Sequence, residues 1–366
     1  MYDFLIVGSG FAGSVLAERI ASKLDKRILL VEKRNHIGGN AYDEFDDNGI
    51  LVHRYGPHIF HTNSSKVFKY LSNFTTWRFY EHKVMANYQN KLYPIPINRT
   101  TLEKYFNKEF RKDGYARKLL NSLSEKRHPI LNSEDMIVNQ IGTELFKVFF
   151  ETYTYKQWHK YPKELNASVC GRIPIRVDED DRYFSDKYQF MPAEGYHILF
   201  KNMLSNRNIE VELNTDYRSI INSVKFDKLI YTGPIDYFFD FVHGHLPYRS
   251  IRFEYESLRQ EYFQPCPQVN YVDDSVPFTR VVEHKYLSGQ KSNTTTISKE
   301  YPQFDGEPFY PIPTDENRSA YKKYKAETGE LKNVIFCGRL AEYQYYNMDQ
   351  VIANALKIFN KIANGK

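Results

Sequence analysis

Cysteine and tryptophan are scarce in this sequence of 366 residues, which has three cysteines and two tryptophans. Cys170, Cys266 and Cys337 form no C-x-x-C pair, and their odd number argues against a disulfide framework or a structural zinc site. No apolar run approaches the ~20 residues of a membrane-spanning helix. The amino terminus has neither the basic region nor the cleavage site of a secretory signal. These absences predict a cytoplasmic protein without a membrane span.

Long blocks of charge of one sign are also missing. The 50 Lys and Arg residues against 45 Asp and Glu residues give a net charge of +5, which is spread along the chain. This excess is too small and too dispersed for a nucleic-acid-binding surface, and it suits an anionic small substrate. The hydrophobic fraction of 42% is that of a globular protein, and the length predicts two or three packing units.

A glycine-rich turn between a strand and a helix is the clearest local pattern. The apolar run 4–7 leads into Gly8-Ser9-Gly10-Phe11-Ala12-Gly13, after which apolar residues recur at helical spacing. A second strand at 28–31 ends in Glu32, where an acidic side chain accepts hydrogen bonds from a ribose. Gly8 permits the turn, Gly10 lets the backbone approach a pyrophosphate, and Gly13 lets helix and strand touch. The pattern predicts a dinucleotide site at the N-terminus of this helix.

Two further segments are expected to return to this dinucleotide site. A Gly38-Gly39-Asn40 string follows the second strand, and there the backbone can again come close to a ligand. Near the other terminus, a strand at 334–337 runs into Gly338-Arg339, and a helix follows with Asp349 as its expected N-cap. By analogy with FAD enzymes, this second helix begins near the far end of the cofactor.

The remaining segments divide into two kinds. Strand-like runs at 209–213 and 229–231 look like later strands of the nucleotide-binding sheet, which makes that domain discontinuous. Residues 101–164 have helical periodicity and few glycines, so they predict a helical insertion. Residues 246–300 alternate aromatic or β-branched with polar residues, as at 269–272 and 280–286, and predict an antiparallel sheet.

Several longer strings identify a family. They are Tyr55–Thr62, Tyr153–Trp158, Arg172–Arg176, Pro277–Arg280 leading to Glu283–Lys285, Gly338–Leu340, and Tyr345. With these strings in this order over essentially its full length, the chain closely resembles the bacterial UDP-galactopyranose mutases. The resemblance implies an α/β fold with a discontinuous Rossmann-like FAD-binding domain, an α-helical insertion domain and an antiparallel β-sheet domain. The expected boundaries are 1–80, 185–245 and 330–366 for FAD binding; 98–165 for the helical substrate and dimerisation domain; and 81–97, 166–184 and 246–329 for the sheet domain.

The resemblance also implies a reaction. Members of the family interconvert UDP-galactopyranose and UDP-galactofuranose without net redox change, through a covalent adduct between the sugar's anomeric carbon and N5 of reduced FAD. The product supplies furanose residues to surface polysaccharides. The expected partners are a UDP-sugar, an electron donor that reduces the flavin, and a second copy of the chain in a homodimer.

Site residues follow by matching motifs. Arg172 and Arg280 match the two arginines that bind the diphosphate, a role for which a permanently charged planar fork is suited. His58 matches a residue that approaches the flavin, and His61 matches one near the sugar. The expected substrate-binding residues are Phe149, Phe150, Tyr153, Trp158, Tyr183, Asn270, Tyr310, Tyr345 and Asn347. The expected cofactor-binding residues are Gly8, Gly10, Phe11, Gly13, Glu32, Lys33, Gly39, Asn40, His58, Thr232, Gly338, Arg339, Met348 and Asp349. For Phe149 and Phe150, a place in the core competes with a substrate contact. No metal-ligand cluster is evident.

Two departures from the family pattern leave the sugar open. Relatives commonly carry Asp where this chain has Asn347, and Lys where it has Gly171. Both changes lie next to the expected sugar-diphosphate site, so UDP-N-acetylgalactosamine, UDP-arabinose or dTDP-fucose are alternative substrates. Two other classes compete: an FAD oxidoreductase of the amine-oxidase type, which would turn over redox equivalents, and a sugar-nucleotide-binding protein that has lost catalysis. The retained Arg172 and Arg280 argue against the second.

Overall fold

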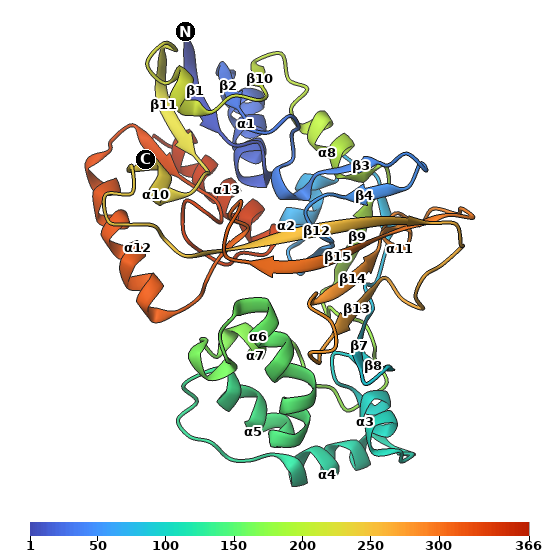
Figure 1. Cartoon of the computed structure of the whole chain (residues 1–366). Coiled ribbons are helices and arrows are strands. Elements are labelled where there is room, and N and C mark those ends of the chain that lie inside the picture. Colours follow the sequence, from blue (N-terminus) through green and yellow to red (C-terminus); the bar gives the residue numbers. More distant parts are fainter. Residues whose placement is uncertain (366) are drawn as a thin grey trace.

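A five-stranded parallel sheet forms the upper part of the molecule in Figure 1, where both termini also lie. The structure, a computed structural model, describes residues 1–365. The strand order is β10-β2-β1-β11-β17, and every neighbouring pair is parallel. The strands are β10 (Ile209–Glu212), β2 (Ile28–Val31), β1 (Tyr2–Val7), β11 (Phe226–Tyr231) and β17 (Val334–Phe336). Strands predicted from distant parts of the chain therefore pair in one sheet, and the α/β class is confirmed.

The central strands β1 and β2 bury apolar residues on both faces because helices cover both. Alternate residues of β1 point to opposite sides: Ile6 joins the core beneath α1 and α13, whereas Leu5 joins the core beneath α9 and α10. The helices are α1 (Phe11–Leu24), α8 (Gly195–Met203), α13 (Met348–Ala363), α9 (Tyr217–Ile220) and α10 (Ile235–Phe238). One expectation is wrong: Asn347, and not Asp349, is the N-cap of α13. Asp349 lies in the first turn and accepts a hydrogen bond from the Thr62 hydroxyl at 2.8 Å.

A seven-stranded sheet crosses the middle of the molecule below the parallel sheet (Figure 1). Its order is β16-β12-β15-β14-β13-β7-β8, and all neighbours are antiparallel except β13 and β7. The strands are β7 (Val84–Tyr88), β8 (Lys91–Ile95), β12 (Tyr248–Leu258), β13 (Gln268–Tyr271), β14 (Arg280–Glu283), β15 (Thr295–Gln303) and β16 (Tyr310–Pro311). The predicted strand 280–286 is too long, because β14 ends at Glu283 and α11 (His284–Ser288) begins at once.

The predicted helical insertion lies at the far side of this sheet from the parallel sheet (Figure 1). Its elements are α3 (Arg99–Phe106), α4 (Asp113–Leu123), α5 (Ser133–Phe146), a π-helical turn (Lys147–Glu151), α6 (Thr152–Trp158) and α7 (Ser168–Gly171). They share a core with β7, β8 and the segment that follows β15. Helix α6 packs against β15 of the antiparallel sheet. Side chains of the helical insertion can therefore contact residues of this sheet.

Short elements complete the chain. They are the strands β3 (Asp43–Phe45), β4 (Leu51–His53), β5 (Phe60–Thr62), β6 (Trp77–Phe79) and β9 (Tyr188–Pro192), the helices α2 (Ser65–Leu71) and α12 (Asp315–Glu327), and the 3-10 turns Gly39–Ala41, Pro162–Glu164 and Thr328–Glu330. Among residues 1–365, no helix has both the length and the apolar composition needed to cross a membrane.

Candidate active site

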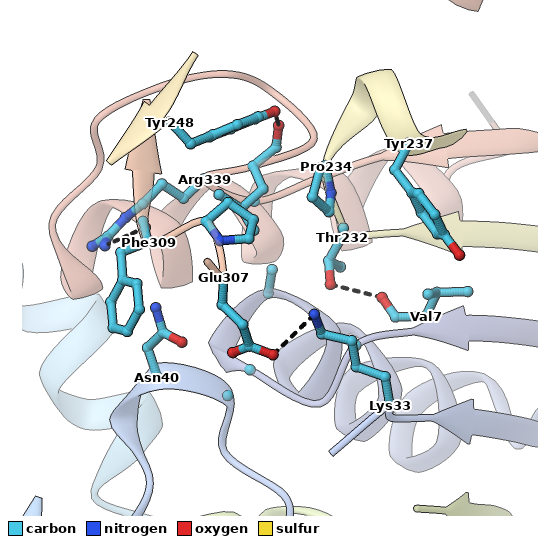
Figure 2. Close-up of a pocket in the computed structure, with 18 of the residues that line it drawn as sticks. Val7, Lys33, Asn40, Thr232, Pro234, Tyr237, Tyr248, Glu307, Phe309 and Arg339 are labelled. Atoms are coloured by element: carbon cyan, nitrogen blue, oxygen red, sulfur yellow. Dashed lines mark hydrogen bonds and ion pairs between the residues drawn. The ribbon is translucent and has the colours of Figure 1, made fainter. Parts of the chain in front are cut away.

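A cavity of about 870 Å³ opens at the carboxyl ends of the parallel strands, which is where α/β sheets bind ligands. Its size is typical of small-molecule and cofactor sites. Figure 2 shows its walls, with β1 and Lys33 on one side and Phe309 and Arg339 on the other. The expected cofactor residues that line it are Gly8, Gly10, Phe11, Glu32, Lys33, Gly39, Asn40, His58, Thr232, Gly338, Arg339 and Met348; Gly13 and Asp349 do not.

Glycines expose the backbone at one wall of this cavity, and Gly13 packs directly behind them. A Cβ placed on Gly39 would lie 2.9 Å from the Cα of Gly10, and one placed on Gly13 would lie 1.9 Å from the carbonyl oxygen of Gly8. Glycine is therefore required at Gly39 and Gly13, as the sequence predicted for Gly13. Helix α1 starts after Gly10 with no side-chain cap and no acidic residue in its first turn. Its free N–H groups and positive helix end fit a pyrophosphate.

Glu32 is held by the protein's own donors. Its buried carboxylate accepts hydrogen bonds from the backbone N–H of Ser9 at 2.9 Å and the Ser9 hydroxyl at 2.8 Å, and from the N–H of Arg34 at 3.1 Å. These bonds fix Glu32 between the glycine turn and the end of β2. Its contact with a ribose stays a prediction.

His58 and Arg339 also line the cavity. The carbonyl oxygen of Gly56 lies 2.9 Å from Nδ1 of His58, so Nδ1 carries the proton and Nε2 is left as an acceptor. Burial lowers the pKa of His58 to about 4, which keeps the imidazole neutral near pH 7. Arg339 donates to the carbonyl oxygens of Phe309 at 3.3 Å and Tyr346 at 2.7 Å. These bonds fix the guanidinium where the cofactor cavity meets the next group of residues.

That group combines arginine with aromatic side chains. Nη2 of Arg172 donates to the Tyr345 hydroxyl at 2.8 Å, and the guanidinium lies 4.5 Å from the centre of the Tyr345 ring. Trp158 meets the rings of Tyr310 and Tyr345 edge-on, at 5.4 Å and 5.7 Å between centroids. Burial raises the pKa of the Tyr345 hydroxyl, but the positive charges of Arg172 and Arg339 outweigh it and lower the pKa below its ordinary value.

Arg280 joins the group from β14. The register of the sheet sets Asn270, Arg280 and Glu300 side by side on three adjacent strands. Nε of Arg280 lies 3.2 Å from the Glu300 carboxylate, whose side chain is 2% exposed. Burial raises the pKa of Glu300, and Arg280 opposes that rise. With one carboxylate among Arg172, Arg280 and Arg339, this part of the site carries excess positive charge, as a diphosphate requires.

Two residues of this group were missed by the sequence analysis. Gln157 donates its amide to the Tyr310 hydroxyl, and its oxygen accepts from Nη2 of Arg280 at 3.3 Å, so it connects an aromatic residue to an arginine. The signal was its place inside the Tyr153–Trp158 string. Glu300 is a strand residue with no motif of its own, and only the pairing of β14 with β15 reveals it.

Four further predicted substrate residues lie outside both cavities. Phe149 and Phe150 are buried in the helical core, where Phe149 packs edge-on against Tyr93. Asn270 is buried and accepts from the Gln268 amide at 2.8 Å. Burial raises the pKa of Tyr153 to about 12. None of these four lines a cavity described here.

Asp186 and Phe184 fix the ring of His61. Its Nδ1 lies 2.9 Å from the Asp186 carboxylate and its ring stacks on Phe184 at 3.7 Å. Tyr183 meets Phe184 edge-on at 5.0 Å and donates its backbone N–H to the His82 carbonyl. Asp186 was not anticipated, and it restricts His61 to one orientation.

Asn347 lines a second, smaller cavity of about 260 Å³, together with Arg172 and Tyr345. Its backbone N–H donates to the side chain of Gln350 at 2.9 Å, which closes the first turn of α13. The residue that departs from the family pattern therefore lies beside the Arg172–Tyr345 pair. Asn347 and the Arg172–Tyr345 pair line the same small cavity, so a ligand bound there could contact all three residues.

Comparison with known proteins decides the family. A family model described as UDP-galactopyranose mutase matches residues 148–345, and one described as an NAD(P)-binding Rossmann-like domain matches residues 6–74. The chain is 36% identical over 368 residues to the dTDP-fucopyranose mutase of Escherichia coli, with 98% of this chain and 97% of that protein covered. The chain belongs to the UDP-galactopyranose mutase family.

Two further relatives fit this assignment. The chain is 36% identical over 386 residues to the UDP-galactopyranose mutase of Mycoplasma genitalium, covering 97% of this chain and 93% of that one. A crystal structure of reduced UDP-galactopyranose mutase superimposes with a TM-score of 0.79 at 15% identity, covering 100% of this chain and 94% of that one. The expected family, the Rossmann-like fold and an enzyme of the isomerase class are confirmed. The same identity to a dTDP-sugar mutase leaves the exact substrate open.

Proposed function

We propose that this mutase interconverts UDP-galactopyranose and UDP-galactofuranose with FAD bound in the large cavity, without net redox change. One observation carries the proposal: Arg339 lines the large cavity, and the Arg172–Tyr345 pair lies close enough to Arg339 for its charges to shift the pKa of the Tyr345 hydroxyl. A bound cofactor and a sugar diphosphate would therefore meet at this point. Reduced FAD would supply the nucleophile for the anomeric carbon of the sugar.

The protein's own residues would bind and release the nucleotide. Arg172 and Arg280 would bind the diphosphate as negative charge develops on it, each through two N–H groups. Gln157 keeps Arg280 and Tyr310 in one arrangement, and Tyr345 would donate its hydroxyl to a phosphate oxygen. Trp158 covers Tyr310 and Tyr345 from the helical insertion, which would keep water from the reacting sugar. Neutral His58 lines the same cavity, and its Nε2 would accept a hydrogen bond from a donor group of the bound cofactor.

An anaerobic assay tests the proposal. The purified protein is examined for flavin absorbance, reduced with dithionite and incubated with UDP-galactofuranose, and both ring forms are followed by chromatography. Interconversion without stoichiometric oxidation of the flavin is expected. Stoichiometric oxidation would assign an oxidoreductase of the amine-oxidase type, and bound flavin with no turnover of any sugar nucleotide would assign a binding protein.

A second substrate is favoured by one observation, the 36% identity to the dTDP-fucopyranose mutase over 98% of the chain. The same chemistry on dTDP-fucose, UDP-arabinose or UDP-N-acetylgalactosamine would use the same diphosphate residues. Running the assay with each nucleotide separates these substrates by kcat/KM.

Asn347→Asp tests whether this position sets the sugar preference. Aspartate is as good an N-cap as asparagine, so the free energy of unfolding should change by less than about 0.5 kcal/mol. A carboxylate accepts stronger hydrogen bonds from sugar hydroxyls, and galactose carries one hydroxyl more than fucose. The ratio of kcat/KM for UDP-galactose to that for dTDP-fucose should rise. An unchanged ratio would place the sugar away from Asn347.

A further inference from the structure

The loop that covers the large cavity joins β15 to β16. All six of its residues, 304–309, line the cavity, and we call this segment the cavity loop. At its ends it is attached to the antiparallel sheet: the N–H of Phe309 donates to the carbonyl oxygen of Arg249 at 2.9 Å, and the Arg249 guanidinium lies 4.4 Å from the centre of the Phe304 ring. Its middle therefore projects from the sheet over a cavity whose floor belongs to the nucleotide fold.

Glu307 of the cavity loop contacts residues on the opposite wall of the cavity, and Figure 2 shows its ion pair with Lys33. Each carboxylate oxygen has a different cation: Oε1 lies 3.1 Å from Nζ of Lys33, and Oε2 accepts from Nε of Arg34 at 3.0 Å. Lys33 and Arg34 directly follow β2 and Glu32. The ion pairs therefore join the antiparallel sheet to the strand that precedes the predicted cofactor contacts.

Arg34 is the more firmly held of the two cations. Its side chain is 13% exposed, its guanidinium lies 4.1 Å from the centre of the Tyr55 ring, and Nη2 donates to the Asn40 side chain at 3.0 Å. Burial raises the pKa of Glu307, but the Arg34 hydrogen bond and the two positive charges outweigh it and lower that pKa. The carboxylate is therefore charged at neutral pH, and it meets a preformed partner when the cavity loop closes.

We propose that Glu307, through its ion pairs with Lys33 and Arg34, holds the cavity loop closed and so retains the bound dinucleotide. The proposal rests on the proposed function only in that FAD is the dinucleotide. It gives Glu307 a positioning role, because the residue acts on the cofactor through the loop and its two cations. Because all six residues of the cavity loop line the cavity, we expect a bound dinucleotide to leave past them and opening of the loop to limit the rate of release.

The experiment measures release of FAD from the oxidised holoenzyme. Flavin fluorescence is followed after dilution for the unaltered protein and for Glu307→Gln, which keeps the shape of the side chain and removes its charge. Exposed ion pairs are individually weak, and two of them predict about three- to tenfold faster release. Raising the salt from about 0.05 M to 0.5 M should accelerate release from the unaltered protein more than from E307Q, because the ion pairs are screened.

A matched control is Glu256→Gln. Glu256 forms one ion pair with Lys299 at 3.0 Å on the antiparallel sheet, and its side chain is 49% exposed against 41% for Glu307. This variant undergoes the same chemical change at a site outside the cavity, so it should release FAD at the rate of the unaltered protein. Far-UV circular dichroism of each variant verifies the fold.

The double variant Lys33→Gln/Glu307→Gln tests the route of the effect. If Glu307 acts through its ion pair with Lys33, Glu307→Gln accelerates release less in the Lys33→Gln protein than in the unaltered protein, and any direct contact of Lys33 with FAD cancels from this comparison. An equal acceleration in both proteins would overturn the proposal. Release from E307Q at the unaltered rate would overturn it too. Slower release would also overturn it, since Glu307 would then be withholding Lys33 and Arg34 from the cofactor's phosphates.

The mutase assay distinguishes the two proposals. Bound FAD with faster release from E307Q but no sugar turnover leaves the loop proposal standing and rejects the proposed function. Normal turnover with unaltered FAD release rejects the loop proposal alone. A protein that binds no FAD would overturn both.

Discussion

Arg280→Ala will lower kcat by about 10³-fold while FAD stays bound, the loss typical of removing a group that stabilises developing charge. Arg280 is placed by β14 between Glu300 and Gln157, away from the glycine floor of the cofactor cavity. Its loss should therefore leave the flavin absorbance of the purified protein unchanged. Arg280→Lys keeps the charge but loses the planar guanidinium, so its kcat should lie between that of the unaltered protein and that of R280A. Anaerobic turnover of UDP-galactofuranose by the reduced enzyme measures each.

Two control variants separate the loss of turnover in R280A from a loss of stability. Arg280→Ala leaves Glu300 buried without its cation, which is destabilising by itself. The double variant Arg280→Gln/Glu300→Gln removes both charges and should regain stability but not turnover. Arg252→Ala removes an arginine on β12, which β15 separates from β14; Arg252 is 49% exposed and paired with Glu254, and this variant should turn over normally. Near-normal turnover by R280A would contradict the assignment of the diphosphate site.

Acidification below about pH 6.5 will destabilise the fold through buried neutral histidines. Burial lowers the pKa of His284 to about 3 and that of His82 to about 4, and it lowers the pKa of His53 well below its ordinary value. The unfolded chain takes up these protons near pH 6.5 and the folded chain does not, so stability falls as the pH falls. Each histidine contributes about 1.4 kcal/mol per pH unit between about 6.5 and its folded pKa.

The hydrogen bonds explain why these rings stay neutral. Nδ1 of His284 accepts the backbone N–H of His53 at 3.2 Å, while its Nε2 lies 2.9 Å from the Ser298 hydroxyl. Nδ1 of His53 in turn accepts the N–H of His58 at 3.2 Å. A proton on either Nδ1 would replace an acceptor with a donor and leave a buried N–H unpaired. The same chain of contacts supports the backbone at His58, which lines the large cavity.

The pH prediction is checked by urea unfolding of the unaltered protein and of His284→Asn between pH 7 and 5. The slope of the free energy of unfolding against pH should be smaller in the variant by about 1.4 kcal/mol per pH unit. The comparison is needed because buried carboxylates act in the opposite sense: burial raises the pKa of Asp43 to about 6. His128 is exposed, and the His128→Asn protein is unfolded under the same conditions as a control for the substitution itself. Equal slopes for all three proteins would show that His284 titrates normally.

Local patterns in the sequence were sufficient to predict the glycine turn at the wall of the large cavity. The strand, the glycine turn and helix α1 are consecutive in the chain, and each glycine answers a short-range requirement: a Cβ at Gly13 would collide with Gly8 only five residues away. The error at the start of α13 was equally local. Asn and Asp are both good N-caps, so the sequence did not distinguish Asn347 from Asp349, and the structure places the helix start one residue after Asn347.

The predicted substrate-binding residues came from separate motifs, and the motifs did not predict how these residues contact one another. The resemblance supplied Arg172, Arg280 and Tyr345 separately. Glu300 follows only from how the strands pair, and the link from Gln157 to Arg280 follows only from where α6 packs against the sheet. A shift of one residue between β14 and β15 would turn Glu300 to the other face of the sheet. The alternation of polar and apolar residues is the same in either register, so the pattern leaves the partner of Arg280 undefined.

The sequence by itself therefore determined the family, the α/β class and the dinucleotide turn, because these rest on contiguous residues whose conformations constrain one another. The tertiary structure alone decided which distant polar side chains meet: Arg172 with the Tyr345 hydroxyl, Arg280 with Glu300, and Glu307 with Lys33 and Arg34. Each pairing joins elements from different sheets, strands or insertions. Coulomb forces act over a few ångströms in space whatever the separation along the chain, so only the folded arrangement specifies them.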